Sequence, residues 1–170
     1  GWISAIDTET DTVTGKVDLD GEPGDNPVLS PDDRFLYDIS WNAKILYKIS
    51  PAELSVVKTL PIAGDPAISV SPDGGLLYQA DHLAGVVHII ETSSLTETGT
   101  YAMPGVQNFS VAPSGDHALA ACHATGSGDA LIHVFDLSTA TVVQTLPRTL
   151  TETKHCLWGK CPILWDAATG

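Results

Sequence analysis

The sequence comprises 170 residues, with eight Lys and Arg against 21 Asp and Glu, which gives a formal net charge of −13 at pH 7. This acidic balance argues against binding to nucleic acids or to anionic membrane surfaces, because both need a basic face. Hydrophobic residues supply 43% of the chain, which is enough for a buried core, but no run of about 18 apolar residues is present to span a bilayer.

A turn motif recurs along the chain at a constant interval. Proline occupies positions 31, 72 and 113, so successive copies lie 41 residues apart. In the second copy the motif reads Ser71-Pro72-Asp73-Gly74. Proline presets φ for the first corner of a turn, and Asp and Gly accommodate the rest of the bend. Each copy therefore predicts a tight turn between two antiparallel strands.

Four strand signals accompany each turn in the same order. A short apolar segment precedes the turn, a second follows it, a third is rich in β-branched residues, and a fourth carries more Thr and charge. In the second unit these segments are residues 67–71, 76–80, 86–90 and 96–101. Four strands in about 41 residues are typical of one blade of a β-propeller. No segment sustains the helical spacing of apolar residues, so the predicted fold is all-β.

The repeat predicts a single propeller domain over residues 1–170. Its four-stranded antiparallel blades are expected at about residues 27–61, 66–102 and 107–147. Residues 2–19 match the third and fourth strands of a blade, so residues 155–166 would supply the first two strands and close a ring of four blades. In the rival interpretation, residues 163–170 start a further blade and the chain is part of a larger ring. The pattern leaves both alternatives open.

These motifs resemble the repeat of the YVTN-type β-propeller family, which is related to the WD and surface-layer repeats. The matching segments are Ile6-Asp7-Thr8-Glu9-Thr10, Gly64-Asp65-Pro66, Ser71-Pro72-Asp73-Gly74 and Leu77-Tyr78. The resemblance extends over residues 2 to about 148, with Asp33 in place of the turn Gly and Ser114 in place of the turn Asp. It implies a propeller, from a family whose rings usually have seven blades. The wider superfamily includes lactonases, subunits of quinone-dependent dehydrogenases, and adhesion or surface proteins.

Candidate ligand-binding residues lie in the loops that face the axial channel of a propeller. Ten residues after each turn proline stand Trp41, His82 and His123. The two imidazoles are candidate ligands for a divalent metal, or candidates for acid–base chemistry with neighbouring carboxylates. The alternative is that these are solvated side chains that cap their own loops. The loops that enter the innermost strands lie on the same face and add Asp65 and Asn108. The complete set of predicted ligand-binding residues is Trp41, Asp65, Asp81, His82, Asn108 and His123.

Other recurring polar residues are assigned to the architecture. His88 and His133 fall in the middle of predicted strands, between β-branched neighbours, and are expected to pack. Asp7, Glu91 and Asp136 recur at the end of the third strand of a unit and are expected to accept hydrogen bonds from turn amides.

The cysteines and the composition bear on the compartment. Cys156 and Cys161 lie five residues apart around Gly159, so a disulfide between them and two free thiols are both open alternatives. The acidic, Lys-poor and Thr-rich composition favours a secreted, periplasmic or cell-surface protein.

The leading functional hypothesis is a non-catalytic propeller that presents its loop face to a protein partner or a small ligand and also self-associates. It rests on the absence of any nucleophile elbow, zinc-protease helix or phosphate-binding loop from the sequence. The first alternative is a lactonase-like hydrolase, or a quinone- or metal-dependent dehydrogenase subunit, with its site at the channel mouth. The second alternative is a repeat fragment of a surface or adhesion protein.

Overall fold

The structure is a computed structural model that describes residues 1–20, 27–64, 67–123 and 130–148. Within these residues the chain forms β-strands joined by turns, as the all-β prediction requires. No helix among them is long and apolar enough to cross a membrane. The predicted fourth blade involves residues 155–166, and the predicted disulfide involves Cys156 and Cys161, so both lie outside the described residues.

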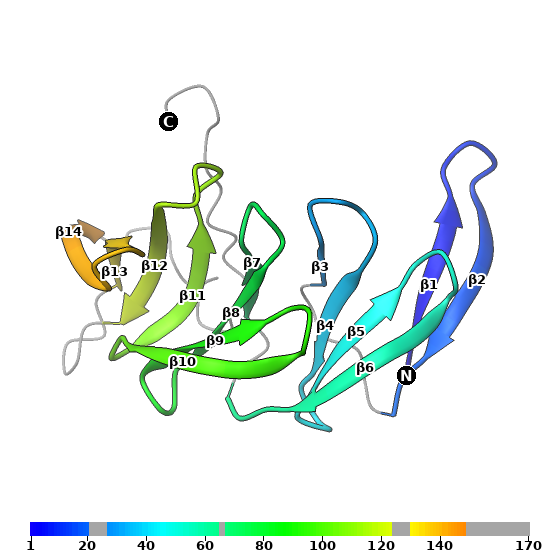
Figure 1. Cartoon of the computed structure of the whole chain (residues 1–170), viewed down its shortest axis with the longest axis horizontal. Helices are drawn as coiled ribbons and strands as arrows, with labels where there is room; N and C mark the ends of the chain where they lie inside the picture. Colours follow the sequence, from blue (N-terminus) through cyan, green and yellow to red (C-terminus); the bar gives the residue numbers. More distant parts are fainter. Residues whose placement is uncertain (21–26, 65–66, 124–129, 149–170) are drawn as a thin grey trace.

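The strands form three four-stranded antiparallel sheets and one two-stranded sheet (Figure 1). The half blade contains β1 (Trp2–Asp7) and β2 (Thr12–Asp18). Blade 1 contains β3 (Val28–Leu29), β4 (Leu36–Ser40), β5 (Ile45–Ser50) and β6 (Ser55–Pro61). Blade 2 contains β7 (Ile68–Val70), β8 (Leu76–Asp81), β9 (Val86–Glu91) and β10 (Thr96–Ala102). Blade 3 contains β11 (Val106–Val111), β12 (His117–His123), β13 (Ala130–Asp136) and β14 (Thr141–Arg148).

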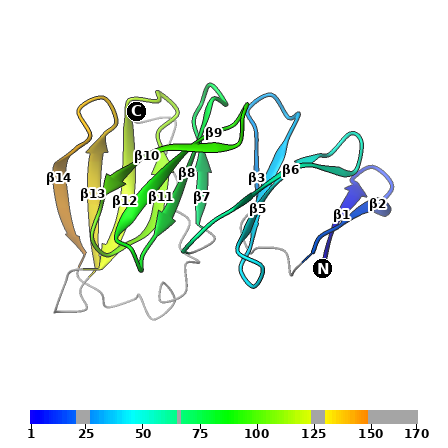
Figure 2. The ribbon, with the colours of Figure 1, turned by 60° about the horizontal axis from the view of Figure 1, so that its bottom comes forward.

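The sheets follow one another along an arc in chain order. The half blade stands at one end of the arc and β14 at the other (Figures 1 and 2). Within each complete blade the strands pair strictly in sequence order, and between blades the first strand β7 contacts both β3 and β11. This radial arrangement of small antiparallel fans confirms the predicted propeller architecture.

The first two proline turns are closed by a serine that precedes the proline, whereas the third turn has Ala112 at this position. Ser71 Oγ accepts a hydrogen bond from the Leu76 amide at 2.9 Å and donates to Asp73 Oδ1 at 2.5 Å, while the Gly75 amide donates to the same Asp73 oxygen at 2.9 Å. Gly74 has a φ of +74°, and Asp33 takes the equivalent position with a φ of +59°. Aspartate tolerates this left-handed conformation better than most residues, which explains why the first turn forms without glycine.

We predict that Ser71→Ala lowers the free energy of unfolding by about 1–2 kcal/mol, because the Leu76 amide loses its acceptor and Asp73 loses a donor. Urea unfolding followed by circular dichroism measures the change. The control is Ser114→Ala in the third turn, where the exposed hydroxyl donates only to Asp116, and we expect a change within about 0.5 kcal/mol. Equal losses in both variants would contradict this account of the turn.

Carboxylates close the turns between the third and fourth strands in the half blade and in blade 3. Asp7 Oδ1 accepts the amides of Glu9 and Thr10 at 2.8 and 3.0 Å. Asp136 makes the same pair of amide contacts, and the Ser138 hydroxyl, together with these amides, lowers the pKa of Asp136 to about 2. These two residues act as predicted. Glu91 differs, because its longer side chain accepts the Ser94 hydroxyl.

Aromatic rings fill the junction between blades 2 and 3. Tyr78 and Phe109 have ring centroids 5.5 Å apart, and Tyr101 and Phe135 have centroids 4.9 Å apart. Phe109 and Phe135 meet edge to face at 5.9 Å, and each is at most 2% exposed. Offset and edge-to-face contacts of this kind add to the hydrophobic gain from burying the rings. The Tyr101 hydroxyl also donates to the Leu137 carbonyl at 3.3 Å across the same junction.

Lysines cross the junction between blades 1 and 2. Lys48 Nζ donates to the Thr92 carbonyl at 2.8 Å, and Lys58 Nζ donates to the Ser94 carbonyl. Apolar side chains of the two blades, including Tyr37 and Leu77, pack beside these contacts. The two junctions therefore have different chemistry, with ammonium groups at the first and aromatic rings at the second.

Candidate functional site

One face of the arc carries the predicted ligand-binding positions, and we call it the loop face. It comprises the β4–β5 turn (41–44), the β8–β9 turn (82–85), the end of β12 at His123, and the segments 62–64 and 103–105 that lead towards the next blades. The proline turns lie on the opposite side, which we call the proline-turn face (Figure 2). Equivalent bonds close the two loop-face turns: Lys44 N donates to Ser40 O, and Gly85 N donates to Asp81 O, both at 2.9 Å.

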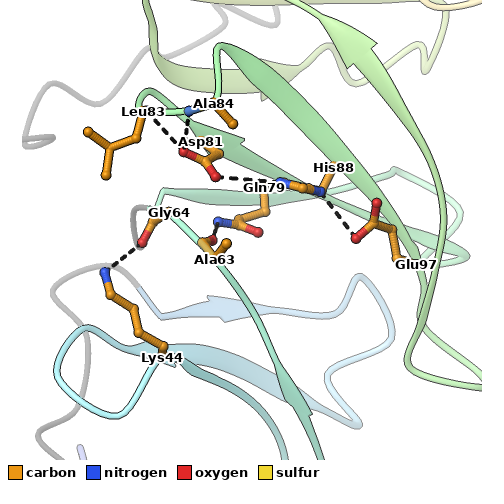
Figure 3. Close-up of polar contacts among 9 residues, drawn as sticks. All are labelled: Lys44, Ala63, Gly64, Gln79, Asp81, Leu83, Ala84, His88 and Glu97. Atoms are coloured by element: carbon orange, nitrogen blue, oxygen red, sulfur yellow. Dashed lines mark hydrogen bonds and ion pairs between the residues drawn. The ribbon is translucent and has the colours of Figure 1, made fainter.

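Trp41 stands at the start of the β4–β5 turn with 47% of its surface exposed. Lys44 Nζ lies 3.6 Å from the centroid of the indole ring, and donates to the Gly64 carbonyl at 2.9 Å. A cation over an aromatic face is attracted by the ring quadrupole, so Lys44 restrains the indole while leaving its other face open. Lys44 thereby ties the Trp41 turn to the segment that leads into blade 2 (Figure 3).

Asp81 is buried at the end of β8, with 2% of its surface exposed. Its Oδ1 accepts the amides of Leu83 and Ala84 at 3.0 Å each (Figure 3). Gly64 lies directly against the carboxyl group, since a Cβ added there would be 2.3 Å from Asp81 Cγ. The carboxylate therefore closes the β8–β9 turn and is covered by the Gly64 backbone.

His88 lies between two carboxylates of blade 2. Its Nε2 is 3.7 Å from Asp81 Oδ2, and its Nδ1 is 3.2 Å from Glu97 Oε2 (Figure 3). The three residues come from β8, β9 and β10, so the imidazole links neighbouring strands of one sheet. His133 is its counterpart in blade 3, where Nδ1 meets Thr145 Oγ1 at 2.8 Å and burial lowers the pKa of the ring.

His82 and His123 occupy corresponding positions on consecutive blades. His82 is the first residue of the β8–β9 turn, and His123 is the last residue of β12; both are half-buried. The residue before His123 is Cys122, which is 1% exposed, and burial raises the pKa of its thiol to about 12. Cys122 is therefore a neutral core residue at the position where blade 2 has Asp81.

Asn108 lies in a different place from the one predicted. It is part of β11, where it pairs with Ala121 beside a β-bulge, and it does not belong to a loop. The bulge adds a residue to the strand, so β11 begins at Val106 and takes in residues that the sequence pattern assigned to the preceding loop. Asp65 lies outside the described residues.

No group of three His, Cys, Asp or Glu side chains gathers into a metal-binding cluster within the described ranges. His82 and His123 are thus not joined there by a third ligand. Of the predicted set, the structure places Trp41, Asp81, His82 and His123 on the loop face, and it adds Lys44, Gly64 and Gln79. Gln79 Nε2 donates to the Ala63 carbonyl at 2.6 Å and holds the same connecting segment (Figure 3).

The sequence contained a signal for one of the loop-face residues that the prediction omitted, Gly64. Gly64 and Gly105 lie one repeat apart, and both have positive φ, at +82° and +78°. A Cβ at Gly105 would be 2.2 Å from the His123 carbonyl oxygen, so each glycine allows the connecting segment to approach the end of the second strand. The contacts of Lys44 and Gln79 had no such signal, because neither residue recurs.

Solved structures of two enzymes have similar folds. A hydrazine synthase from Kuenenia stuttgartiensis matches with a TM-score of 0.73 and 22% sequence identity, over 84% of this chain and 42% of the other. The dihydro-heme d1 dehydrogenase NirN, solved in complex with DHE, matches with a TM-score of 0.59 and 15% identity, over 87% of this chain and 42% of the other. This chain thus spans less than half the length of either protein.

No family model matches the sequence, and no curated protein matches it either. The YVTN-type assignment therefore stays a prediction. Because the sequence identities are only 22% and 15%, the structural similarity is evidence for the fold alone. Together with the three four-stranded sheets, it establishes this chain as a β-propeller segment.

Proposed function

We propose that this chain is part of a larger β-propeller whose loop face binds a small, planar and partly apolar ligand. The observation that carries the proposal is the recurrence of a ring at one loop position: Trp41, His82 and His123 occupy it in three consecutive blades. Backbone hydrogen bonds fix the turns that carry Trp41 and His82, and another fixes His123 at the end of β12, so the rings form a pre-organised surface.

The exposed apolar side chains of the loop face support this proposal. Trp41 is 47% exposed and Leu83 is 77% exposed, and they stand in the turns of neighbouring blades. An apolar ligand would cover this surface, and the removal of apolar area from water would contribute favourably to the free energy of binding. The imidazoles of His82 and His123 would supply polar contacts or axial ligands at the same face.

The buried groups beside the rings favour binding over catalysis by this chain. Asp81 uses Oδ1 to close its own turn, and Oδ2 faces His88 within the sheet. The Cys122 thiol is neutral, and a thiolate would be needed for nucleophilic attack. Asp81 therefore supports the turn that carries His82, and Cys122 packs in the core beneath His123.

Titration with iron protoporphyrin IX tests the proposal, because this probe is planar, apolar and able to accept an imidazole ligand. We expect a saturable shift of its Soret band and quenching of tryptophan fluorescence. Removing an axial imidazole with His82→Ala or His123→Ala should change the band position and weaken binding about tenfold or more. Trp41→Ala should weaken binding by a similar factor.

The control is His117→Ala, since His117 lies at the start of β12, on the proline-turn face, and its side chain is partly exposed. This variant should bind the probe like the unmodified chain. If all three histidine variants bind equally well, the porphyrin attaches nonspecifically and the loop face is not the site.

An enzymatic role is the second candidate, favoured by the fact that the two similar structures are a synthase and a dehydrogenase. In that case the loop face would hold a cofactor and leave one side of it open to a substrate. Carbon monoxide binding to the reduced porphyrin complex separates the two roles. Binding of carbon monoxide favours the enzyme, and complete occupation of the iron by side chains favours a binding module.

A further inference from the structure

A cavity of about 390 Å³ opens between blades 1 and 2 on the proline-turn face, away from the loop face. Blade 1 contributes its proline turn and the adjoining parts of β4 and β5, and blade 2 contributes its proline turn and the β9–β10 turn. The wall residues that matter here are Asp32, Phe35, Tyr37, Lys48, Asp73 and Thr92.

Lys48 brings a buried positive charge to this cavity. Its side chain is on β5 and the residue is 8% exposed. The ammonium group donates to the Thr92 carbonyl at 2.8 Å and lies 3.9 Å from the centroid of the Phe35 ring. Within the described part of the chain, no carboxylate oxygen lies in ion-pair distance of it. A buried charge is costly unless a partner of opposite sign compensates it, and Asp32 attracts this ammonium group only from beyond ion-pair distance, so the cation in the cavity wall is incompletely compensated.

The architecture does not need a lysine at this position. In blade 2 the equivalent of Lys48 is Ile89. Lys48 pairs with Tyr37, and Ile89 pairs in the same way with Tyr78, the equivalent of Tyr37. At the next junction the Leu137 carbonyl, which corresponds to that of Thr92, accepts the Tyr101 hydroxyl instead. A propeller junction in the same molecule is thus built from neutral residues. The charge of Lys48 calls for a different explanation.

Two carboxylates stand at the rim of the cavity on consecutive blades. Asp32 and Asp73 occupy the same position in their proline turns, and both are exposed. Hydrogen bonds from Ser30 and Ser71 hold one oxygen of each and lower the pKa of both carboxyls, so they are ionised at neutral pH. The cavity therefore has a positive group in its wall and negative groups at its mouth.

We propose that this cavity binds a small zwitterion of the amino-acid class, with its carboxylate against Lys48 and its ammonium group between Asp32 and Asp73. A simple anion would meet the repulsion of the two rim carboxylates, and a simple cation would leave Lys48 uncompensated. A ligand that carries both charges satisfies both ends of the cavity. The Thr92 hydroxyl is already donated to Gly74 at 2.7 Å, so specificity rests on the charged groups.

Isothermal titration calorimetry at low ionic strength tests this with glycine, 4-aminobutanoate and 6-aminohexanoate, which span a range of charge separations. Hexanoate and hexylamine are the matched single-charge probes. We expect at least one amino acid to bind at one site per chain, about tenfold more tightly than either single-charge probe. Lys48→Met should lower that affinity about tenfold or more, because a charge-assisted contact is lost.

Lys58→Met is the control for Lys48→Met. Lys58 also donates to a carbonyl of the β9–β10 turn, but it is exposed and does not line the cavity, so its loss should leave the affinity unchanged. Asp73→Asn tests the other end without touching the lysine, and the amide oxygen can still accept the Gly75 amide. This variant should weaken binding of the amino acid and strengthen that of hexanoate, because one of the two carboxylates that repel the anion is gone.

Three results would overturn the proposal. The first is that none of the three amino acids binds saturably, which would make this a water-filled gap between blades. The second is that hexanoate binds as tightly as the amino acids, since the rim carboxylates would then have no role. The third is an equal loss of affinity in the two lysine variants. If Lys48→Met fails to fold, as judged by thermal melting, Asp73→Asn alone decides.

Discussion

Phe109→Ala is expected to lower the free energy of unfolding by about 3–5 kcal/mol, the usual cost of removing a buried phenyl ring. Phe109 is 1% exposed and lies between Tyr78 and Phe135, with centroid distances of 5.5 and 5.9 Å. Its ring belongs to the packing between blades 2 and 3, so truncation leaves a cavity that only a shift of whole sheets could close. Urea unfolding monitored by tryptophan fluorescence and circular dichroism gives the difference.

Trp41→Ala is the matched control for this prediction, since it also removes an aromatic ring. The indole is 47% exposed on the loop face, and its loss should change the free energy of unfolding by no more than about 1 kcal/mol. A small effect of Phe109→Ala, close to that of Trp41→Ala, would show that the junction between blades 2 and 3 is loosely packed.

Gly105→Ala is expected to cost about 3 kcal/mol, from strain in the left-handed region together with a steric clash. Gly105 has a φ of +78°, and its new Cβ would lie 2.2 Å from the carbonyl oxygen of His123. That oxygen belongs to the backbone, and the His123 amide is bonded to Gly105 O at 2.8 Å, so neither segment can move away without breaking the contact.

Gly115→Ala separates the two causes. Gly115 has nearly the same φ, +79°, but the nearest heavy atom to its added Cβ is 3.7 Å away on Pro72. The substitution should therefore cost only the backbone strain, about 1 kcal/mol. Chemical denaturation of both variants yields the comparison, and similar losses would mean that the close approach of Gly105 to β12 is easily relaxed.

The blades were predictable because their signals are local. A Ser-Pro-Asp-Gly turn is closed by bonds such as Leu76 N to Ser71 Oγ, which span five residues, and recurrence of the turn fixed the strand order. Strand starts were less predictable. Asn108 was assigned to a loop because the bulge that extends β11 depends on pairing with β12, and no residue type announces it.

The candidate sites were predictable only in part, for the same reason. Trp41, His82 and His123 could be placed on one face because they share a position in the repeat. The contacts of Lys48 could not be foreseen, since its partner Thr92 is 44 residues away on another blade and the contact depends on how the sheets twist. Lys48 and Gln79 do not recur in the repeat, so their contacts could be found only from the structure.

The unequal junctions have a consequence for how the arc deforms. Ammonium-to-carbonyl bonds join blade 1 to blade 2, and the Lys48 bond weakens when that ammonium group loses its proton. Between blades 2 and 3, burial raises the pKa of the Tyr78 and Tyr101 hydroxyls, that of Tyr78 to about 12. Burial and the nearby Arg34 and Lys58 charges lower the pKa of Lys48, so its contact with Thr92 weakens as the solution becomes alkaline. We therefore expect the lysine-bridged boundary to loosen before the ring-filled one as the pH rises.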